Sequence, residues 1–373
     1  MSIRKAFRSK TEIVSLKTMS ETLSFVRVQS DDLILTTKNI YDIFLQSSLK
    51  NNKILFREDY GTGQILDTTV DKIAKDAGAS YKRVIGIGPG SVMELAKLLS
   101  LEKFSPFADI YHQRFALKKI RDLILIPSTP GTGTEVTPYC AVVMSSLGVQ
   151  TVLNDDCLYA DYALLCPELL EDLPFKAMAS SSFDSFVHAF ESYLSPLATP
   201  FSKTMSLKAM EIIIKAWSSI ACNGAGALND NIALLQQAGT MAGIGYANAG
   251  CAAIHATAYP LAVRLSLSHG ESNYITFFEI VKIYKEKKAI GSLDDIECMA
   301  CEILDCKKDE SFAYLERLCN NILSRKKLSA LGMKENQILE FTDMVMTRQH
   351  MLIANGYVQL SPGEIADVYK NLF

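Results

Sequence analysis

Residues 83–97 read RVIGIGPGSVMELAK, and this stretch predicts a strand that runs through glycines directly into a helix. The apolar run 83–87 is typical of a buried strand. The backbone N–H groups and the positive end of the helix dipole then face the glycine turn, which suits a bound anion. Taken alone, the loop that contains Gly88, Gly90 and Ser91 could equally be an ordinary turn.

A second loop of the same kind follows the apolar run 122–127 and reads PSTPGTGTEVT over residues 127–137. Its glycines allow the backbone to approach a ligand closely, and its hydroxyls can bond phosphate or ribose oxygens. The hydroxyl residues that we expect to bind the cofactor are Ser128, Thr129, Thr132 and Thr134. Two such loops after neighbouring parallel strands predict a dinucleotide site, because ligands bind at the carboxyl ends of such strands.

The rest of the chain divides into two kinds of pattern. Short apolar runs at 32–36 and 52–56 alternate with helical spacing at 39–48 and 67–77, which indicates parallel βαβ units. Beyond residue 174 the pattern is helical throughout, with long runs at 201–220, 231–259, 296–304 and 361–372. A chain of 373 residues also exceeds what one core usually supports. The sequence therefore predicts an α/β nucleotide-binding domain with a parallel sheet in residues 1–174 and an all-helical domain in residues 175–373.

Composition excludes several classes of partner. The chain is 49% hydrophobic and 21% charged with a net charge of −3, which gives no electrostatic footprint for nucleic acid. Nine scattered cysteines favour reduced thiols and a cytoplasmic protein. Residues 231–263 carry no charged side chain, but their glutamines, asparagines, histidine and glycines favour buried core helices over a membrane span.

Three of the five histidines, with one aspartate, form a candidate metal site in the helical part. Asp184 and His188 are spaced i,i+4, so both leave the same face of a helix. Together with His255 and His269 they offer one carboxylate and three imidazoles, a plausible set for a divalent first-row metal. Any one of these histidines alone would more often be a hydrogen-bonded core residue. A straight helix would separate His255 from His269 by about 21 Å, so we expect the chain to turn back at Pro260 and the following SLSHG.

With these elements in order, the sequence resembles the iron-containing (group III) alcohol dehydrogenase family over nearly its whole length. The first loop is similar to the family's GGGSxxDxxK, although Pro89 replaces a glycine and Glu94 an aspartate. The second loop is similar to PTTAGTGSEVT, and the four candidate ligands match Asp-x3-His and His-x13-His. The resemblance implies a helical metal-binding domain and hydride transfer between NAD(P) and an alcohol or aldehyde. Fe(II) is the favoured ion, with Zn or Mn as alternatives.

The resemblance also carries expectations about substrate and cofactor. Tyr259 stands where many members have a histidine and is a candidate proton relay. Thr37 stands where an aspartate often excludes NADP, so NADP stays open although NAD is the favoured cofactor. The segments SSFDSFVHAFESYLSP, HGESNYITFFEI and LGMKENQILEF are most similar to members that act on 4-hydroxybutyrate. We therefore expect a small ω-hydroxy acid, 4-hydroxybutyrate with succinic semialdehyde. Sulfoacetaldehyde, a neutral aldehyde such as butyraldehyde, a dehydroquinate-synthase-like lyase activity and a non-catalytic metal-storing role remain alternatives.

Arg264 lies between the last two candidate ligands. We predict that it pairs with an anionic substrate tail; an ion pair elsewhere in the protein is the alternative. A homo-oligomer, with a dimer favoured, is the expected assembly.

Overall fold

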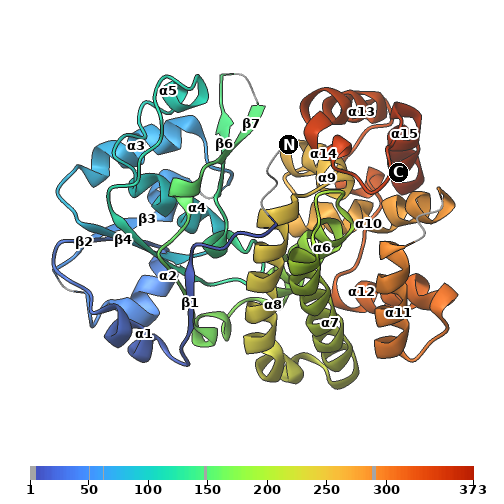
Figure 1. Cartoon of the computed structure of the whole chain (residues 1–373), viewed down its shortest axis with the longest axis horizontal. Coiled ribbons are helices and arrows are strands. Elements are labelled where there is room, and N and C mark those ends of the chain that lie inside the picture. The colour runs from blue at the N-terminus through green and yellow to red at the C-terminus, as the bar shows by residue number, and fades with distance from the viewer. Residues whose placement is uncertain (1–5, 50, 62, 147–148, 288–290) are drawn as a thin grey trace. The chain divides into compact units, whose positions relative to one another are not determined.

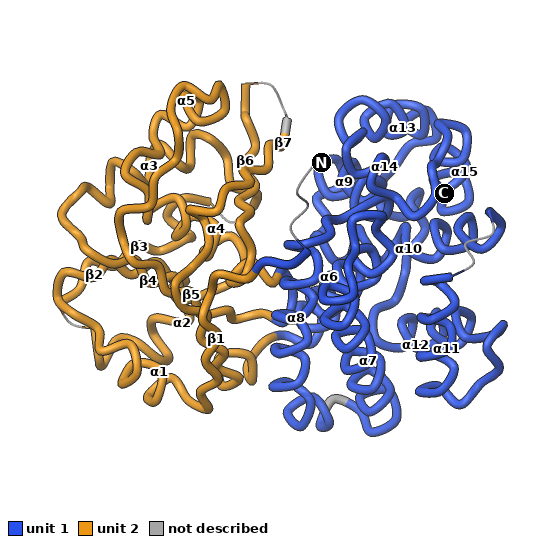
Figure 2. The backbone as a smooth tube through the Cα atoms, viewed as in Figure 1, with its two compact units in different colours: residues 1–8, 130–132, 174–373 blue, residues 9–129, 133–173 orange. Residues whose placement is uncertain are grey.

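The computed structural model describes residues 6–49, 51–61, 63–146, 149–287 and 291–373 (Figure 1). Figure 2 shows that the chain forms two compact units. The α/β unit contains Ser9–Thr129 and Gly133–Leu173. The helical unit contains Pro174–Phe373 together with residues 6–8 and three residues of the second glycine loop, Pro130–Thr132.

The α/β unit is built on a parallel sheet. In the described part of the chain, six strands pair in the order β1-β8-β5-β4-β2-β3, each neighbour parallel to the next. The strands are β1 (Glu12–Ser15), β2 (Asp32–Thr36), β3 (Lys53–Phe56), β4 (Arg83–Gly88), β5 (Asp122–Pro127) and β8 (Tyr162–Leu165). The helices between them are α1 (Met19–Val26), α2 (Lys38–Ile40) with a π turn at Tyr41–Leu45, α3 (Asp67–Ala77), α4 (Gly90–Leu99) and α5 (Phe107–Tyr111). This confirms the predicted parallel sheet.

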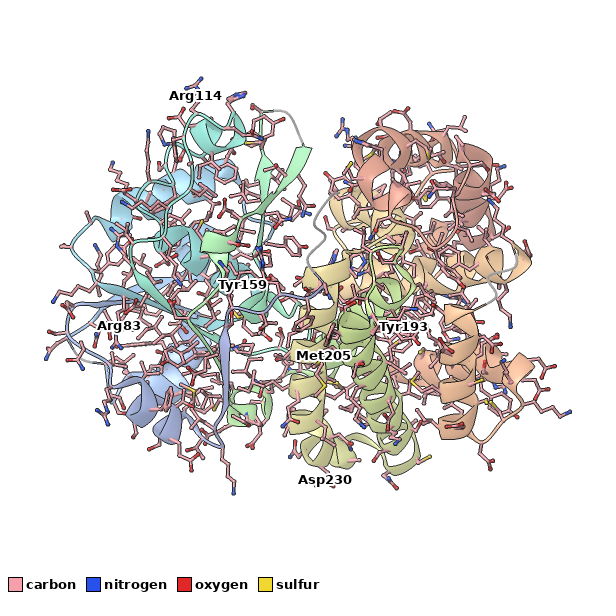
Figure 3. The ribbon with its side chains drawn as sticks, in the orientation of Figure 1. Arg83, Arg114, Tyr159, Tyr193, Met205 and Asp230 are labelled. Carbon is pink, nitrogen blue, oxygen red and sulfur yellow. The ribbon has the colours of Figure 1, made fainter. Side chains whose placement is uncertain are left out.

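The central strands are apolar on both faces, as a parallel sheet covered on both sides requires. Leu33 and Leu35 of β2 pack into one core with α3, α4 and α5, while Ile34 between them is also fully buried. At the opposite edge from the glycine loops, Arg83 of β4 (Figure 3) donates two hydrogen bonds to the buried carboxylate of Asp32 on β2, at 2.8 and 2.6 Å. That bidentate pair joins the first residues of two neighbouring strands.

Four strands were not predicted from the sequence. Strands β1 and β8 pair with each other through four residues each. The other two form an antiparallel hairpin, β6 (Tyr139–Met144) and β7 (Val149–Asn154). In β6 the buried residues alternate with partly buried ones, which is the period of a half-buried strand.

In the described residues after Leu173, the helical unit contains only α-helices, short 3-10 turns and the loops that join them. Its helices are α6 (Phe175–Leu194), α7 (Pro200–Asn223), α8 (Leu228–Ala249), α9 (Ala253–Leu265), α10 (His269–Glu286), α11 (Ser292–Leu304), α12 (Ser311–Ile322), α13 (Gln337–Arg348), α14 (His350–Ala354) and α15 (Pro362–Leu372). Among the described residues, none of the helices combines the length and apolar content that crossing a membrane requires.

The chain turns between His255 and His269 within the predicted SLSHG segment, but it does not turn at Pro260. The uncharged run 231–259 is split by Gly250, which ends α8 with a positive φ of 76° that favours glycine. Pro260 then lies inside α9, and the chain turns only after Leu265, where Ser266 has a φ of 54°. Ser268 and Glu271 form a reciprocal capping box that starts α10 at His269. The two histidines therefore lie in different helices, as predicted, each near a helix start.

Lys97 of the first glycine motif is a buried structural residue. Its ammonium donates to the carbonyl oxygens of Thr137 and Tyr139 at 2.8 and 2.7 Å and to the Thr137 hydroxyl at 3.1 Å. All three ammonium donors are thereby used. Burial lowers the pKa of Lys97 and the nearby carboxylate of Glu94 partly offsets this effect, so the resulting pKa is about 8. The residue thus ties α4 to the end of the second glycine loop and to the start of β6.

Replacing Lys97 by methionine should destabilise the α/β unit by at least about 2 kcal/mol, because buried acceptors that lose their donor carry a desolvation penalty. Urea denaturation measures this change. Lys75→Met, at an exposed position of α3, is the matched control and should change the free energy of unfolding by less than about 0.5 kcal/mol. Equal stability of the two variants would contradict the structural role.

Candidate metal centre

Helix α6 supplies the first two residues of the centre. Asp184 and His188 lie one turn apart on it and are 2% and 5% exposed. Helix α10 approaches α6 closely because Gly270 has no side chain: a Cβ there would lie 1.9 Å from the Ser180 carbonyl oxygen. This contact places His269, the first residue of α10, beside Asp184.

The structure brings all four sequence-predicted ligands together. Each offers a ligand atom that lies within 4.8 Å of the other three. The Nε2 atoms of His255 and His269 are 3.9 and 3.6 Å from Asp184 Oδ1. Three of the four side chains are buried, and that of His269 is half-exposed. One carboxylate and three imidazoles at this spacing can surround a single cation.

Two buried atoms of the centre lack a hydrogen-bond partner within the described part of the chain. His188 Nδ1 and Asn273 Oδ1 have no hydrogen-bond partner among the described residues. Buried polar atoms of this kind call for a compensating ion or water. The donor set and these two atoms together fit a divalent ion held by Asp184, His188, His255 and His269.

The charges of the centre also suit a cation. Burial raises the pKa of Asp184. The imidazoles of His269, His188 and His255 and the amide of Asn273 together lower it by more, so the pKa lies below its ordinary value and the carboxyl is an anion. Burial lowers the pKa of His188 to about 3, which keeps its imidazole neutral. An anionic carboxylate and a neutral imidazole are the protonation states that ligate metals.

Part of the second glycine loop lies against the helices that carry these ligands. The hydroxyl of Ser185, the residue after Asp184, is 2.5 and 2.7 Å from the carbonyl oxygens of Pro130 and Gly131. Tyr246 of α8 stacks on His188 with ring centroids 4.3 Å apart. Its hydroxyl donates to the Thr132 carbonyl at 3.2 Å.

A cavity of about 470 Å³ opens beside the centre. Its lining includes the metal-ligand candidates Asp184 and His269 and also Thr132 of the second glycine loop. The hydroxyls of Ser180 and Ser268 also face it, 2.8 Å from each other, as does the side chain of Lys176. A residue predicted to bind the cofactor and two predicted metal ligands therefore share one cavity.

The remaining predicted cofactor residues lie at the carboxyl ends of β4 and β5. These two strands are neighbours in the sheet, and Gly88 pairs with Pro127 in their register. The N–H of Ser128 donates to the Gly88 carbonyl at 3.1 Å, which joins the two loops directly. Gly90 and Ser91 begin helix α4, while Thr129 and Thr134 flank the glycines of the second loop.

The two predicted catalytic residues lie away from the described lining of this cavity. Tyr259 is buried one turn after His255 on α9. Arg264 is half-exposed and pairs with Glu340 of α13 at 2.8 Å. In this structure Arg264 forms an ion pair within the protein, which was the alternative to binding the substrate. Substrate binding by Arg264 stays a prediction.

Three polar residues around the centre were not found from the sequence. They are Glu191, Asn273 and Lys176. Asn273 donates to Asp184 Oδ1 at 2.8 Å and follows His269 by four residues, a helical spacing that could have revealed it. Glu191 follows His188 by three residues and could have been found in the same way. Lys176 stands at the start of α6 with no motif to distinguish it.

Comparison with known proteins identifies the class. A model of the Fe-containing alcohol dehydrogenase family, C-terminal part, matches residues 178–373, and a model of iron-containing alcohol dehydrogenase matches residues 13–167. The chain belongs to the iron-containing alcohol dehydrogenase family and is an oxidoreductase. The family expected from the two glycine loops and the four ligands is thereby confirmed.

Individual relatives differ in what they act on. A 4-hydroxybutyrate dehydrogenase from Clostridium kluyveri is 35% identical over 370 residues, 99% of this chain and 100% of the relative. A sulfoacetaldehyde reductase from Bilophila wadsworthia is 28% identical over 76% of this chain and 74% of its own. The crystal structure of a sulfoacetaldehyde reductase from Bifidobacterium kashiwanohense in complex with NAD+ has the same fold, with a TM-score of 0.86 at 21% identity over 100% of this chain and 99% of that one.

Zinc added to the metal-free protein should bind at one equivalent and raise its melting temperature. At free zinc about 100-fold above Kd the added stability is about 2.7 kcal/mol, because the ion binds only the folded state. His188→Ala should lose both the binding and the shift. His350→Ala, at an exposed position of α14, is the control and should keep both. An unchanged shift in His188→Ala would show that zinc binds elsewhere.

Proposed function

We propose that this protein is an iron-dependent, NAD-linked dehydrogenase of a small ω-hydroxy acid, with 4-hydroxybutyrate and succinic semialdehyde as its substrate pair. The observation that carries the proposal is the shared cavity. Thr132 of the glycine loop and the ligands Asp184 and His269 line the same space. Similarity to the Clostridium kluyveri enzyme over 99% of the chain supports the substrate class.

The chain's residues have distinct tasks in this reaction. The four ligands would hold the ion, and the two glycine loops would hold the dinucleotide. When bound, the ion supplies a Lewis acid for the alcohol oxygen and the nicotinamide exchanges a hydride. Ser185 and Tyr246 hold the loop segment Pro130–Thr132 against the helices of the helical unit, which keeps this part of the second glycine loop beside the metal centre. Tyr259, one turn after His255, is the proposed proton relay.

The anionic end of the substrate has a candidate partner in Lys176. Its ammonium bonds Glu271 at 2.6 Å, and its side chain lines the cavity that also contains two metal ligands. An ammonium has three donors, so it can bond a substrate carboxylate while it keeps this contact. Among the described residues that line the cavity, Lys176 alone is a lysine or arginine. Arg264 lies outside this lining and pairs with Glu340.

The choice of NAD over NADP is supported by acidic groups near the end of β2. Thr37 caps α2 there, accepting from the Ile40 N–H at 3.4 Å. The Lys38 N–H donates to Glu58 at 3.0 Å, and the Lys38 ammonium pairs with Asp59 at 2.8 Å. The Lys38 ammonium offsets the charge of Asp59, so Glu58 is the carboxylate that would disfavour an additional phosphate at the ribose position expected of such a sheet.

Cellular location and assembly complete the proposal. All nine cysteines are free thiols, as a reducing compartment allows, and we place the enzyme in the cytoplasm. A dimer remains the proposed assembly.

After anaerobic loading with Fe(II), the protein should oxidise 4-hydroxybutyrate with net formation of NADH, followed by absorbance. Its kcat/KM for succinic semialdehyde should exceed those for sulfoacetaldehyde and butyraldehyde, and NADH should be preferred to NADPH. Removal of the ion with a chelator should abolish turnover. Preference for sulfoacetaldehyde or butyraldehyde would overturn the substrate, and absence of net NADH formation would favour lyase or storage roles.

Lys176→Gln should lower kcat/KM for succinic semialdehyde about 10-fold, because a hydrogen bond to a charged group contributes about 1.5 kcal/mol. The effect on butyraldehyde should be small, since it has no anionic end. Arg264→Gln is the matched comparison. A selective loss with Arg264→Gln and none with Lys176→Gln would transfer the anion-binding role to Arg264.

A further inference from the structure

Glu191 is a buried carboxylate that contacts one of the metal ligands. It lies on α6, one turn after His188, and is 1% exposed. Its Oε2 atom is 2.6 Å from Nδ1 of His255. A buried charge is costly unless it is fully hydrogen-bonded, so the partners of this carboxylate indicate what it is there to hold.

The other partners of Glu191 are backbone N–H groups at the start of α9. Ala252 donates to Oε2 at 2.8 Å, and Ile254 donates to Oε1 at 2.5 Å. These N–H groups belong to the first turn of a helix, which lacks intrahelical acceptors and carries the positive end of the dipole. One carboxylate therefore fixes both the backbone that carries His255 and the imidazole ring itself.

The contacts of the ring determine which nitrogen carries the proton. Nδ1 faces a carboxylate, which only accepts, so Nδ1 carries the hydrogen and donates it. Nε2 lies 3.3 Å from the amide nitrogen of Asn273, which only donates, so Nε2 presents its lone pair. That same Nε2 atom is the one directed at Asp184. The arrangement presets His255 as a ligand through Nε2.

We propose that Glu191 is a positioning residue of the metal centre: it holds His255 in the orientation and tautomer that bind the ion. The inference rests on the proposed function in that it takes the four-residue centre to bind a divalent ion. Partners of this kind orient metal-bound histidines, and their removal typically lowers metal affinity by about 10–100-fold.

A different role for the same group is a second metal site. Cys251, Glu191 and His255 also offer ligand atoms within 4.8 Å of one another. Both Glu191 oxygens, however, already accept hydrogen bonds from backbone N–H groups. An ion there would have to displace the bonds that start α9, which favours the positioning role.

The substitution Glu191→Gln tests the proposal with little change of shape. A glutamine replaces one acceptor oxygen with an NH2 donor. In place of either oxygen, this NH2 group would face a backbone N–H group that now donates to Glu191. If the NH2 group takes the place of Oε2, α9 loses the bond from Ala252 and the ring must move its hydrogen to Nε2. If it takes the place of Oε1, α9 loses the bond from Ile254. We expect the Kd for Zn²⁺, measured by competition with a chelator, to rise about 10–100-fold. Glu279→Gln is the matched control, because Glu279 is also a nearly buried carboxylate, bonded to Lys282 and Asn371, but lies about 15 Å along α10 from His269.

A second measurement covers the case in which Glu191→Gln does not fold. In the zinc-loaded full chain labelled with 15N-histidine, the His255 ring should carry hydrogen on Nδ1. Hydrogen on Nε2, or a Kd for Glu191→Gln within about twofold of both wild type and Glu279→Gln, would overturn the inference. Failure of the wild-type chain itself to bind zinc at the four-residue centre would instead overturn the proposed function.

Discussion

The structure of the helical unit depends on the carboxylate of Asp184, which is charged and almost completely buried. Such a group is stable in a protein interior only when it is paired. The chain surrounds it with the imidazoles of three histidines and the amide of Asn273, drawn from three helices. A divalent ion held by the four residues would complete this arrangement, because it would place a positive charge directly beside the carboxylate. The packing of α6, α9 and α10 and the chemistry of the centre therefore depend on the same group.

Around this centre, contacts that support the ligands also reach the segment expected to hold the cofactor. Helix α6 carries Asp184 and His188 as ligands, Glu191 as the partner of His255, and Ser185 as the contact to the second glycine loop. Tyr246 makes the same connection from α8, with its ring on His188 and its hydroxyl on the loop. A hydride transfer needs the reacting carbon and the nicotinamide held together, and building both supports on one helix is a direct way to achieve it.

The sequence predicted the features that have a fixed local period or spacing. The apolar strands before the glycine loops and the i,i+4 pair of Asp184 and His188 are of this kind, and the structure has both. It failed where a tertiary contact decides the outcome. Pro260 suggested a turn, but α9 continues through it, and the chain turns only at Ser266, within the SLSHG segment that was also predicted to turn. The pairing of Arg264 with Glu340 is another tertiary contact that no local pattern indicates, and binding of a substrate anion by Arg264 stays a prediction.

The central claim is that Asp184, His188, His255 and His269 bind one ion. Anomalous diffraction at the iron absorption edge, from crystals of the Fe(II)-loaded protein, tests it directly. The account predicts one strong peak bounded by the Asp184 carboxylate and the three imidazoles, at about 2.0–2.2 Å from each ligand atom. A peak bounded by Glu191 and Cys251, or by any other set of residues, would contradict it.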